Sequence, residues 1–574
     1  MKKLVFLISL FLFNNLVNAQ VRVDKSVQLQ LKKSSHVPVL IYLKERAQLN
    51  DIKESWTKEQ KGQYVYNNLK STATRSQSTI LNYFKLKKIN SKSFFIANAI
   101  HAEITSLELS DLMQMDEIVS ITYDVSTSIE SFQHDQDAHQ AKQRSAELTW
   151  GNKNIQSDLV WQMGIEGEGV TVAGEDTGYR WDLEGIKERY RGWKDSIVDH
   201  NYNWHDAIHT ISPLASDSIN PCGLNSKVPC DDNGHGTHTM GTMVGKTNEY
   251  LYGVAPKAKW IGCRNMERGN GALSTYIECF EYFMAPTDTN GLNPLPSLAP
   301  HVINNSWYCS IEEGCNLSNF EVMHEVIKNL RKAGIVVVVS AGNQGANCST
   351  IAHPPSMFEE SFSIGSFAEN DSISGFSAMG PVKIDSSLRI KPNVVAPGSA
   401  VLSRTMGGNY EAWNGTSMAG PHTAGLVALI ISANPKLAGN VEQIENIIES
   451  TSRPASAHFV CDTFSMDAIP NNMYGYGKIN AFAAVQKAQL YVAAQDIDRD
   501  EKIKIFPNPG KDFLKIQSIS ALEKISVYNA IGQLIYTHRT NESTLYIDTK
   551  SWDSGLYFIR NSVSTTGNIW IKQE

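Results

Sequence analysis

Three short motifs carry side chains that could act together in nucleophilic catalysis. They are V-A-G-E-D-T-G around Asp176, D-D-N-G-H-G-T-H around His235 and N-G-T-S-M-A-G-P-H around Ser417. A serine hydroxyl is a weak nucleophile at neutral pH and needs an adjacent base. A neutral imidazole can accept its proton and return it to a leaving group, and a buried carboxylate can hold that imidazole in the required tautomer. The motifs predict Ser417 as nucleophile, His235 as general base and Asp176 as the orienting carboxylate.

Each motif alone is only modestly specific, but the three together, in the order Asp, His, Ser, are much more so. This order resembles that of the subtilisin-like proteases, or subtilases. Supporting segments of the family pattern are G-V-A-P-K-A from Gly253, V-I-N-N-S from Val302, S-A-G-N from Ser340 and K-P-N-V-V-A-P-G from Lys391. The resemblance spans about residues 148–490. It implies a serine endopeptidase that hydrolyses peptide bonds through an acyl-enzyme and requires no cofactor.

Two groups are candidates for binding the oxyanion of the reaction. Ser417 precedes an apolar helical pattern over residues 418–432, so its backbone N–H is expected at a helix N-terminus, where donors are free and the helix dipole favours negative charge. The resemblance implies that the side chain of Asn343 is the second donor.

The resemblance also implies that peptide substrates add as a strand between two segments. Gly269 and Gly271 belong to the first segment, and Ser306 and Trp307 to the second. The second segment departs from the family pattern, because Trp307-Tyr308-Cys309 stands where small glycines are usual. The preferred substrate side chain is therefore not predicted.

The other histidines of the motifs, His238 and His422, are expected to be packed structural residues. No acidic run with the spacing of a calcium loop is present. No residue is therefore assigned to a metal, although the family resemblance leaves a structural calcium open.

The fold class follows from alternating strand and helix patterns over residues 148–490, which predict an α/β domain with a mostly parallel sheet. The β-branched run at 335–341 is typical of a strand buried on both faces. By resemblance this is the three-layer catalytic domain of subtilisin. The 574-residue chain is too long for a single core, so further domains are expected.

The N-terminus predicts a signal peptide over residues 1–19. Two lysines precede an apolar stretch that ends in Val17-Asn18-Ala19, a pattern typical of export signals. An uncleaved anchor is the alternative, although Asn14-Asn15 interrupts the run early. No other segment is long and apolar enough to span a membrane. We expect a secreted or cell-surface protein, exported through the periplasm.

Residues 20–147 are interpreted as a propeptide and a cleavable linker. Residues 37–124 show an α+β pattern near the order β-α-β-β-α-β, with one helix over 61–88. Residues 125–147 are polar and indicate an exposed linker. Position and length resemble the subtilase propeptide, which would inhibit its own enzyme. The alternative is an N-terminal domain that the mature protein retains.

Residues 498–574 show short alternating strands, typical of a small all-β sandwich. The entry Ile505-Phe506-Pro507-Asn508-Pro509 and the late strand Gly555–Ile559 resemble the C-terminal sorting domain of type IX secretion cargo. The machinery of that system is therefore an expected partner. A carbohydrate-binding or adhesive sandwich is the alternative, which is disfavoured because no aromatic platform is obvious.

All eight cysteines fall between residues 222 and 461. An even number in an exported chain predicts up to four disulfides. Cys222 with Cys230 and Cys309 with Cys315 are close enough in sequence to form local loops. The remaining pairs are left open.

Composition excludes some classes of protein. The net charge is −7 and charged residues make up 19%, so no basic surplus indicates nucleic-acid binding. Protein or peptide substrates are the expected partners. Two other functions stay open: an adhesive protein built on an inactive protease scaffold, and a narrow maturation protease for one partner.

Overall fold

The computed structural model describes residues 21–573, apart from residues 130–132, 135–146, 216–218, 310–314, 318, 346, 458–459, 462–463, 466, 500–503, 519–521, 531 and 562–566. The predicted signal peptide lies outside the described residues. The chain divides into two compact units, Met1–Val485 and Gln486–Glu574, which are described separately below.

The first unit is built around a seven-stranded sheet in which every neighbouring pair is parallel. Its order is β12 (Trp204–Asp206), β14 (Lys259–Arg264), β9 (Thr171–Asp176), β17 (Val302–Asn305), β18 (Val336–Ser340), β19 (Phe362–Phe367) and β20 (Val394–Pro397). Every residue of β18 is buried, as its β-branched sequence predicts.

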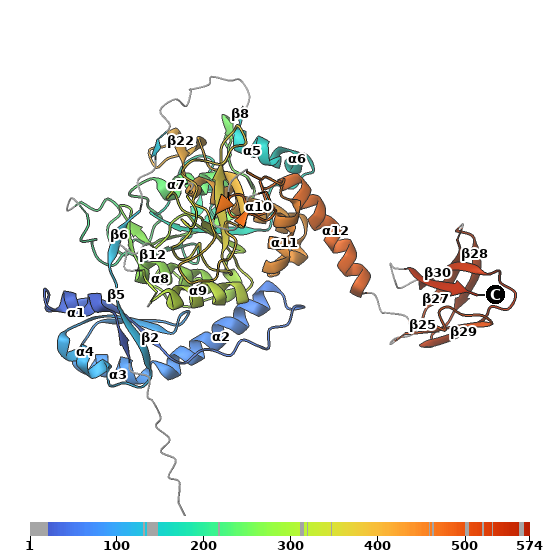
Figure 1. The fold of residues 1–574 in the computed structure, drawn as a ribbon, viewed down its shortest axis with the longest axis horizontal. Helices are drawn as coiled ribbons and strands as arrows, with labels where there is room; N and C mark the ends of the chain where they lie inside the picture. The colour runs from blue at the N-terminus through green and yellow to red at the C-terminus, as the bar shows by residue number, and fades with distance from the viewer. Residues whose placement is uncertain are drawn as a thin grey trace, which may run out of the picture. The chain divides into compact units, whose positions relative to one another are not determined.

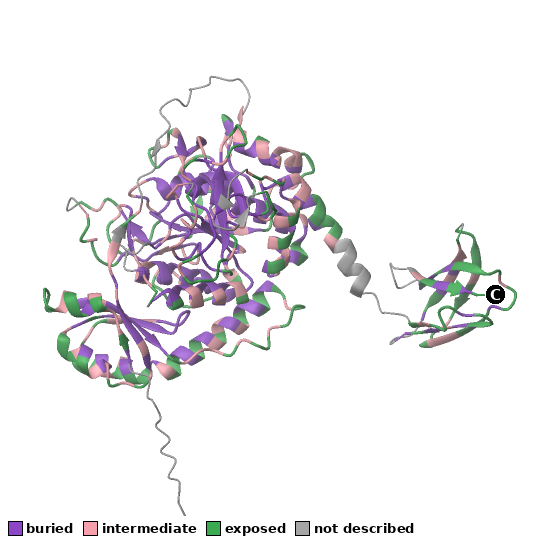
Figure 2. Ribbon diagram, viewed as in Figure 1, coloured by how far each residue is buried: buried purple, intermediate pink, exposed green. Residues whose placement is uncertain are grey.

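Helices cover both faces of this sheet, which makes a three-layer α/β domain (Figure 1). The α7 helix (His235–Val244) and the α10 helix (Thr416–Ala433) pack on one face. On the other face, α8 (Leu273–Met284) and α9 (Phe320–Lys332) share a core with alternate strand residues such as Val337 and Val339. Figure 2 shows the sheet and α10 as the most deeply buried part. The predicted fold class is confirmed.

The N-terminal part of this unit carries a five-stranded sheet of order β1-β5-β2-β4-β3. Its elements are β1 (Arg22–Val23), α1 (Lys25–Leu31), β2 (Val37–Leu43), α2 (Lys58–Ser76), α3 (Ser78–Lys87), β3 (Ser91–Phe94), β4 (Ala99–Ile104), α4 (Ser106–Leu112) and β5 (Ile118–Tyr123). The predicted element order is largely found, but the single predicted helix over 61–88 is two helices. They meet at Gln77, which is buried and donates its side-chain amide to the carbonyl of Phe94 at 3.1 Å.

This small sheet packs against α8 and α9. Leu40 and Tyr42 of β2 belong to the same hydrophobic core as residues of both helices. The carboxylate of Glu281 in α8 accepts the backbone N–H groups of Phe95 and Ile96, at 2.5 and 3.0 Å. Burial raises the pKa of Glu281 to about 7. The N-terminal part is thus fixed to the part that carries the seven-stranded sheet by both apolar packing and polar contacts.

Four disulfides are present. The two local pairs expected from sequence, Cys222–Cys230 and Cys309–Cys315, are confirmed. The other two are Cys263–Cys279, which joins β14 to α8, and Cys348–Cys461, which closes a long loop. The described cysteines include no free thiol.

The second unit begins with the end of α12 (Ala481–Arg499) and is all-β from Lys504 on, as predicted for residues 498–574. One sheet has the order β25-β26-β29 and the other β28-β27-β30-β31. The strands are β25 (Lys504–Phe506), β26 (Phe513–Gln517), β27 (Lys524–Asn529), β28 (Leu534–Arg539), β29 (Thr544–Asp548), β30 (Gly555–Asn561) and β31 (Gly567–Lys572). Alternate residues, among them Ile525, Ile559 and Trp570, form its core.

The sequence shows no obvious aromatic platform in this unit, and the structure exposes two aromatic rings on one sheet. Phe506 and Tyr546 have the ammonium of Lys515 between them, at 4.9 and 5.1 Å from the ring centroids. The three residues face each other in register across β25, β26 and β29. Lys515 lies on β26, a strand that is not among those predicted for this unit.

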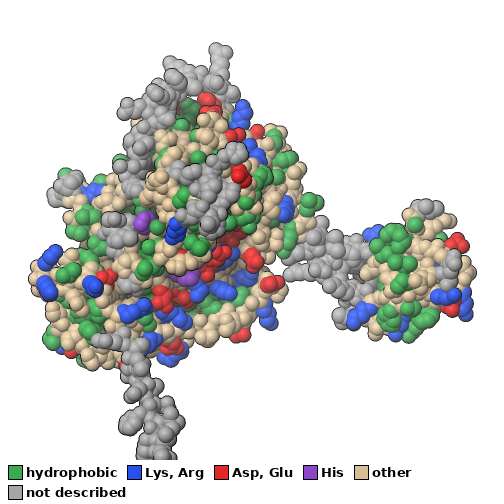
Figure 3. Space-filling model, viewed as in Figure 1, with side chains coloured by type: hydrophobic (Ala, Val, Ile, Leu, Met, Phe, Trp, Pro, Cys, Tyr) green, Lys and Arg blue, Asp and Glu red, His purple; other side chains and the backbone are tan. Residues whose placement is uncertain are grey.

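Charges of both signs are interspersed on the face of the molecule drawn in Figure 3, without one dominant basic patch. In the part of the chain that the structure describes, no helix combines the length and apolar character of a membrane span.

Candidate active site

The predicted base and carboxylate meet where a strand ends and a helix begins. Asp176 is the last residue of β9, and His235 is the first residue of α7. The Nδ1 atom of His235 lies 2.7 Å from Oδ1 and 2.9 Å from Oδ2 of Asp176. Both side chains are fully buried. Because an ionised carboxylate only accepts, Nδ1 carries the proton and Nε2 is left as the basic nitrogen.

Asp231 holds the segments that carry this pair. Its Oδ1 accepts the hydroxyl of Thr177 at 2.9 Å and the backbone N–H of Gly234 at 2.8 Å. Its Oδ2 accepts both the hydroxyl and the N–H of Thr237, at 2.5 and 3.1 Å. One carboxylate thus joins the residue after Asp176 to the first turn of α7. Burial raises the pKa of Asp231. Asp231 belongs to the motif around His235, but the sequence alone does not indicate a role for it.

The nucleophile candidate, Ser417, lies in the first turn of α10, as predicted. Its Oγ donates to the carbonyl oxygen of Ser306 at 3.2 Å, and the Ser306 hydroxyl donates to the carbonyl of Ser417 at 2.9 Å. Ser306 directly follows β17 and also accepts the side-chain amide of Asn304 at 2.9 Å. The structure therefore brings the predicted substrate-binding residue Ser306 against the nucleophile candidate Ser417 through two reciprocal hydrogen bonds.

Asn343 lies beside the same helix start. Its Oδ1 accepts the N–H and the hydroxyl of Thr416, both at 2.9 Å. An N–H donor requires an oxygen acceptor, so these contacts fix the orientation of the amide. The NH₂ group of Asn343 then points away from Thr416 as a donor, next to the residue that precedes Ser417.

Trp413 links the histidine to the serine segment. Its ring lies nearly parallel to that of His235, with centroids 6.5 Å apart, and stacks on His238 at 4.5 Å. Trp413 lies on β22 (Tyr410–Asn414), four residues before Ser417 in the sequence. The sequence analysis gave Trp413 no role, and only the fold shows that its ring packs against both imidazoles.

The glycines predicted to bind substrate lie along a short edge strand, β16 (Asn270–Ala272), already covered by part of this chain. The β6 strand (Ser126–Ser128) pairs antiparallel with it, and the N–H of Ile129 donates to the carbonyl of Gly269 at 2.6 Å. A Cβ on Gly269 would lie 2.9 Å from Cγ2 of Ile129, and its φ is +80°. Gly269 therefore permits the close approach of the covering strand.

A second short pairing involves the strand that leads to Ser417. The β7 strand (Gln133–His134) pairs antiparallel with Trp413 and Asn414 of β22. The interpretation of 125–147 as an exposed linker, made from composition, does not include these two strand pairings. Their pairing uses backbone groups, which composition does not reveal. Residues 130–132 and 135–146 lie outside the described part.

The side chain of Trp307 is in the core. It is 3% exposed and stacks on Tyr276 of α8, with centroids 3.9 Å apart. Tyr276 in turn lies beneath Gly271, where an added Cβ would meet its hydroxyl at 2.5 Å. The pair supports the edge strand from below, and of Trp307 only the backbone remains for a direct contact with a bound strand.

His238 and His422 are packed, as expected. The Nε2 of His238 donates to the carbonyl of Glu411 at 3.1 Å, and Nδ1 of His422 donates to the carbonyl of Met418 at 2.8 Å. Burial lowers their pKa values to about 3 and about 4, which keeps both rings neutral near pH 7.

Glu175, the neighbour of Asp176, faces the opposite side of the sheet. It is fully buried, and the side chain of Asn265 is its hydrogen-bonding neighbour. Burial, with the charge of Asp176, raises the pKa of Glu175 well above its usual range. Sequence periodicity would place an apolar residue here. Among the described residues, no group of three or more His, Cys, Asp or Glu has metal-binding geometry.

Comparison with known proteins agrees with this geometry. Residues 167–477, more than half of the chain, match the model of the subtilase family. The chain belongs to the subtilase family. The matched range contains all four candidate catalytic residues of this subtilase. Residues 504–572 match the model of a secretion-system C-terminal sorting domain.

Similar curated subtilases include bacillopeptidase F of Bacillus subtilis, 30% identical over 524 residues, which are 84% of this chain and 34% of that protein. Serine protease AprX of the same species is 28% identical over 345 residues, 55% of this chain and 66% of AprX. This chain thus spans about a third of the length of the first relative. The epidermin leader peptide processing serine protease of Staphylococcus aureus has the same fold, with a TM-score of 0.56 at 16% identity, over 79% of this chain and 99% of that one.

Proposed function

We propose that this chain is a secreted serine endopeptidase with Ser417 as nucleophile, His235 as general base and Asp176 as the orienting carboxylate. The observation that carries the proposal is the buried bond from His235 Nδ1 to Asp176 at 2.7 Å, in the same domain as the helix start at which Ser417 and Asn343 meet. The subtilase relatives support it.

The chemistry follows from these groups. His235 Nε2 takes the Ser417 proton while Oγ attacks the carbonyl carbon of the scissile peptide. Asp176 stabilises the imidazolium that forms. The N–H of Ser417 and the NH₂ of Asn343 bind the oxyanion. His235 then protonates the leaving amine, and water hydrolyses the acyl-enzyme by the same steps. These steps use protein groups alone.

Substrate would bind as an added strand on β16, in the place that residues 126–129 take in this chain. Backbone hydrogen bonds supply the affinity in this mode and are independent of sequence. The carbonyl of Gly269, which accepts Ile129 at 2.6 Å, and the backbone of Ser306 and Trp307 would hold the strand. Extended or unfolded protein segments are therefore the proposed substrate class.

Residues 20–147 would act as the propeptide and its cleavable linker. Their sheet is packed on α8 and α9. The β6 strand pairs with β16, and β7 pairs with β22, which ends three residues before Ser417. This arrangement excludes other peptides from β16. The chain between Ile129 and Gln133 is then the proposed site of maturation cleavage.

The two ends of the chain would direct export. A signal peptide over residues 1–19 delivers the protein to the periplasm, and the C-terminal sorting domain passes it to type IX secretion machinery. The expected destination is the cell surface or the medium.

Turnover of an unfolded protein such as casein tests the activity, with and without a serine-directed covalent inhibitor. Hydrolysis that the inhibitor abolishes supports the proposal. Hydrolysis that it leaves unchanged would contradict a serine nucleophile.

A further inference from the structure

Arg264 is a buried cation at the end of the strand next to Asp176. It is the last residue of β14, in register with Asp176 on β9. Its side chain is 0% exposed. A buried guanidinium is costly unless charged partners and acceptors surround it. Its partners therefore show what the cation holds in place.

Two carboxylates and a loop closed by a disulfide surround the guanidinium of Arg264. Nη2 lies 3.0 Å from Asp232 Oδ2, and Nη1 lies 3.5 Å from Asp206 Oδ2. Burial raises the pKa of Asp206, while the Arg264 charge lowers it. The guanidinium also donates to Asn220 Oδ1 at 3.3 Å and to the Gly223 carbonyl at 3.2 Å.

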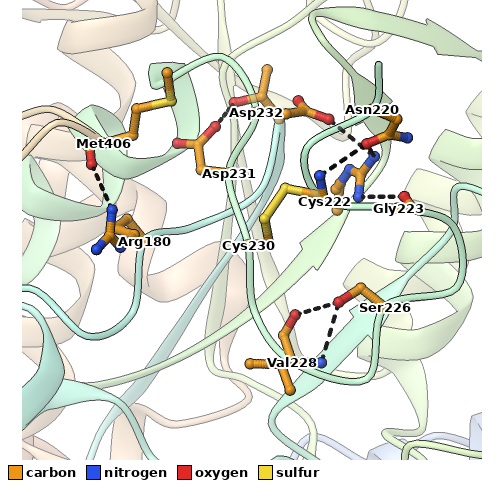
Figure 4. Close-up of a disulfide and its surroundings, with 12 residues drawn as sticks. Arg180, Asn220, Cys222, Gly223, Ser226, Val228, Cys230, Asp231, Asp232 and Met406 are labelled. Carbon is orange, nitrogen blue, oxygen red and sulfur yellow. Dashed lines mark hydrogen bonds and ion pairs between the residues drawn. A yellow bond between two sulfur atoms is a disulfide. The ribbon is translucent and has the colours of Figure 1, made fainter. Parts of the chain in front are cut away.

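The loop that supplies these acceptors is closed by a disulfide. Figure 4 shows Asn220 and Gly223 at one end of the Cys222–Cys230 bridge, and Asp231 and Asp232 directly after its other end. The N–H of Cys222 donates to Asn220 Oδ1 at 3.0 Å. Arg264 thus ties the segment from Asn220 to Asp232, which precedes His235, to the carboxyl end of β14 in the central sheet.

Besides pairing with Arg264, Asp232 also accepts a backbone hydrogen bond. Its Oδ1 accepts the backbone N–H of Arg268 at 2.8 Å. Arg268 lies between β15 (Met266–Glu267) and β16, with φ of +51°. Its side chain donates to Glu267 Oε1 at 2.8 Å and to the Ile219 carbonyl at 3.0 Å. Asp232 therefore fixes the residue from which the substrate edge strand begins.

The neighbouring Asp231 fixes the start of α7, as described above. Two consecutive carboxylates thus act on the two halves of the site, one on the base and one on the edge strand. Any displacement of Asp232 is passed through a single peptide unit to Asp231.

We propose that Arg264 is a positioning residue: through Asp232 it holds the β16 edge strand and the His235 turn in one fixed relation. This rests on the proposed endopeptidase function. Arg264 touches neither substrate nor reacting atoms. A buried ion pair adds little to stability compared with apolar residues of similar size, so the expected effect of its loss is on geometry.

The test uses two substrates and four variants of the full chain. A small acyl ester needs only the catalytic groups, whereas a peptide of six residues also needs β16. Arg264→Met removes the cation, and Arg264→Lys restores the charge without the fork of donors. Asp232→Asn keeps the Oδ1 acceptor for Arg268 but replaces the charged Oδ2 that faces Arg264 with an NH₂ donor. Arg331→Met, which breaks the pair with Glu445 at 2.5 Å away from the site, is the matched control.

We expect Arg264→Met to lower kcat/KM for the ester about 10-fold and for the peptide about 100-fold, since small misplacements have effects of this size. Arg264→Lys should recover part of both losses, and Asp232→Asn should lose more on the peptide than on the ester. Equal losses on both substrates, or losses no larger than those of Arg331→Met at equal Tm, would overturn the inference. Failure of the proposed function is distinguishable, because the unmodified protein would then hydrolyse neither substrate.

Discussion

The side-chain oxygen of Asn343 accepts both the N–H and the hydroxyl of Thr416, each at 2.9 Å. This bidentate contact fixes the amide, so that its NH₂ group is presented beside the start of α10. We predict that Asn343→Ala lowers kcat by about 10²- to 10³-fold, the size measured when such a donor is removed from subtilisin, and leaves KM nearly unchanged. Steady-state kinetics on a peptide check this, with Thr416→Ser as the control that keeps the hydroxyl. A rise in KM alone would show that Asn343 binds the ground state.

The pairing of Ile129 with Gly269 predicts where the chain is cut. Mass spectrometry of mature protein from culture medium should reveal a cut between Ile129 and Gln133, because β6 before this stretch pairs with β16 and β7 after it pairs with β22, next to Ser417. Gly269→Ala should slow the cut, since its Cβ would lie 2.9 Å from Ile129. Gly291→Ala, at a positive φ with no atom near the added Cβ, is the control. Retention of residues 20–124 in the active form would contradict the assignment.

Glu175 should reduce stability. It is fully buried beside the charge of Asp176, so Glu175→Met should raise the free energy of unfolding by about 1–3 kcal/mol. Its pKa is raised on folding, so stability falls as pH rises above the unfolded value of about 4.3. The variant should lose this part of the pH dependence in thermal unfolding followed from pH 4 to 8.

Glu278 is the matched comparison, a buried carboxylate of α8 paired with His205 and His209 at 2.7 and 2.9 Å and with Lys92. Its pKa is held well below the usual range despite burial, so its contribution is lost as pH falls. Glu278→Met should destabilise the protein. If both substitutions changed stability in the same direction, the argument about Glu175 would fail.

Lys92 should contribute to the binding of the N-terminal part to α8. It lies on β3 and pairs with the buried Glu278 of the catalytic part. Lys92→Met removes this cation and should shorten the lag before activity appears in the full chain, because the N-terminal part is released sooner. Lys85→Met, an exposed lysine of α3, serves as control. An unchanged lag would show that apolar packing alone holds the propeptide.

The sequence predicted what depends on local pattern and on motifs. The run at 335–341 indicated a buried strand, and the motif residues Asp176 and Ser417 indicated a strand end and a helix start. Disulfides with short sequence separation were also predictable, whereas Cys348–Cys461 is not, because residues 113 apart are brought together only by the fold.

The features that the sequence did not predict have a common physical cause, because they depend on tertiary contacts. The strands at 126–128 and 133–134 are formed by backbone pairing to distant segments, and polar composition conceals them. Arg264 and Asp232 are ordinary surface residue types, and only the tertiary structure buries them together. Trp307 was expected at the substrate, but stacking on Tyr276 places its ring in the core.

The central claim is tested most directly by Ser417→Ala in the full chain. The account predicts that this variant folds with an unchanged Tm, remains uncut near residue 130, and loses casein hydrolysis by about 10⁴-fold or more. A fluorophosphonate should modify the unsubstituted protein at Ser417, seen by peptide mass spectrometry, and leave the variant unlabelled. Full activity of Ser417→Ala, or labelling at another serine, would contradict the account.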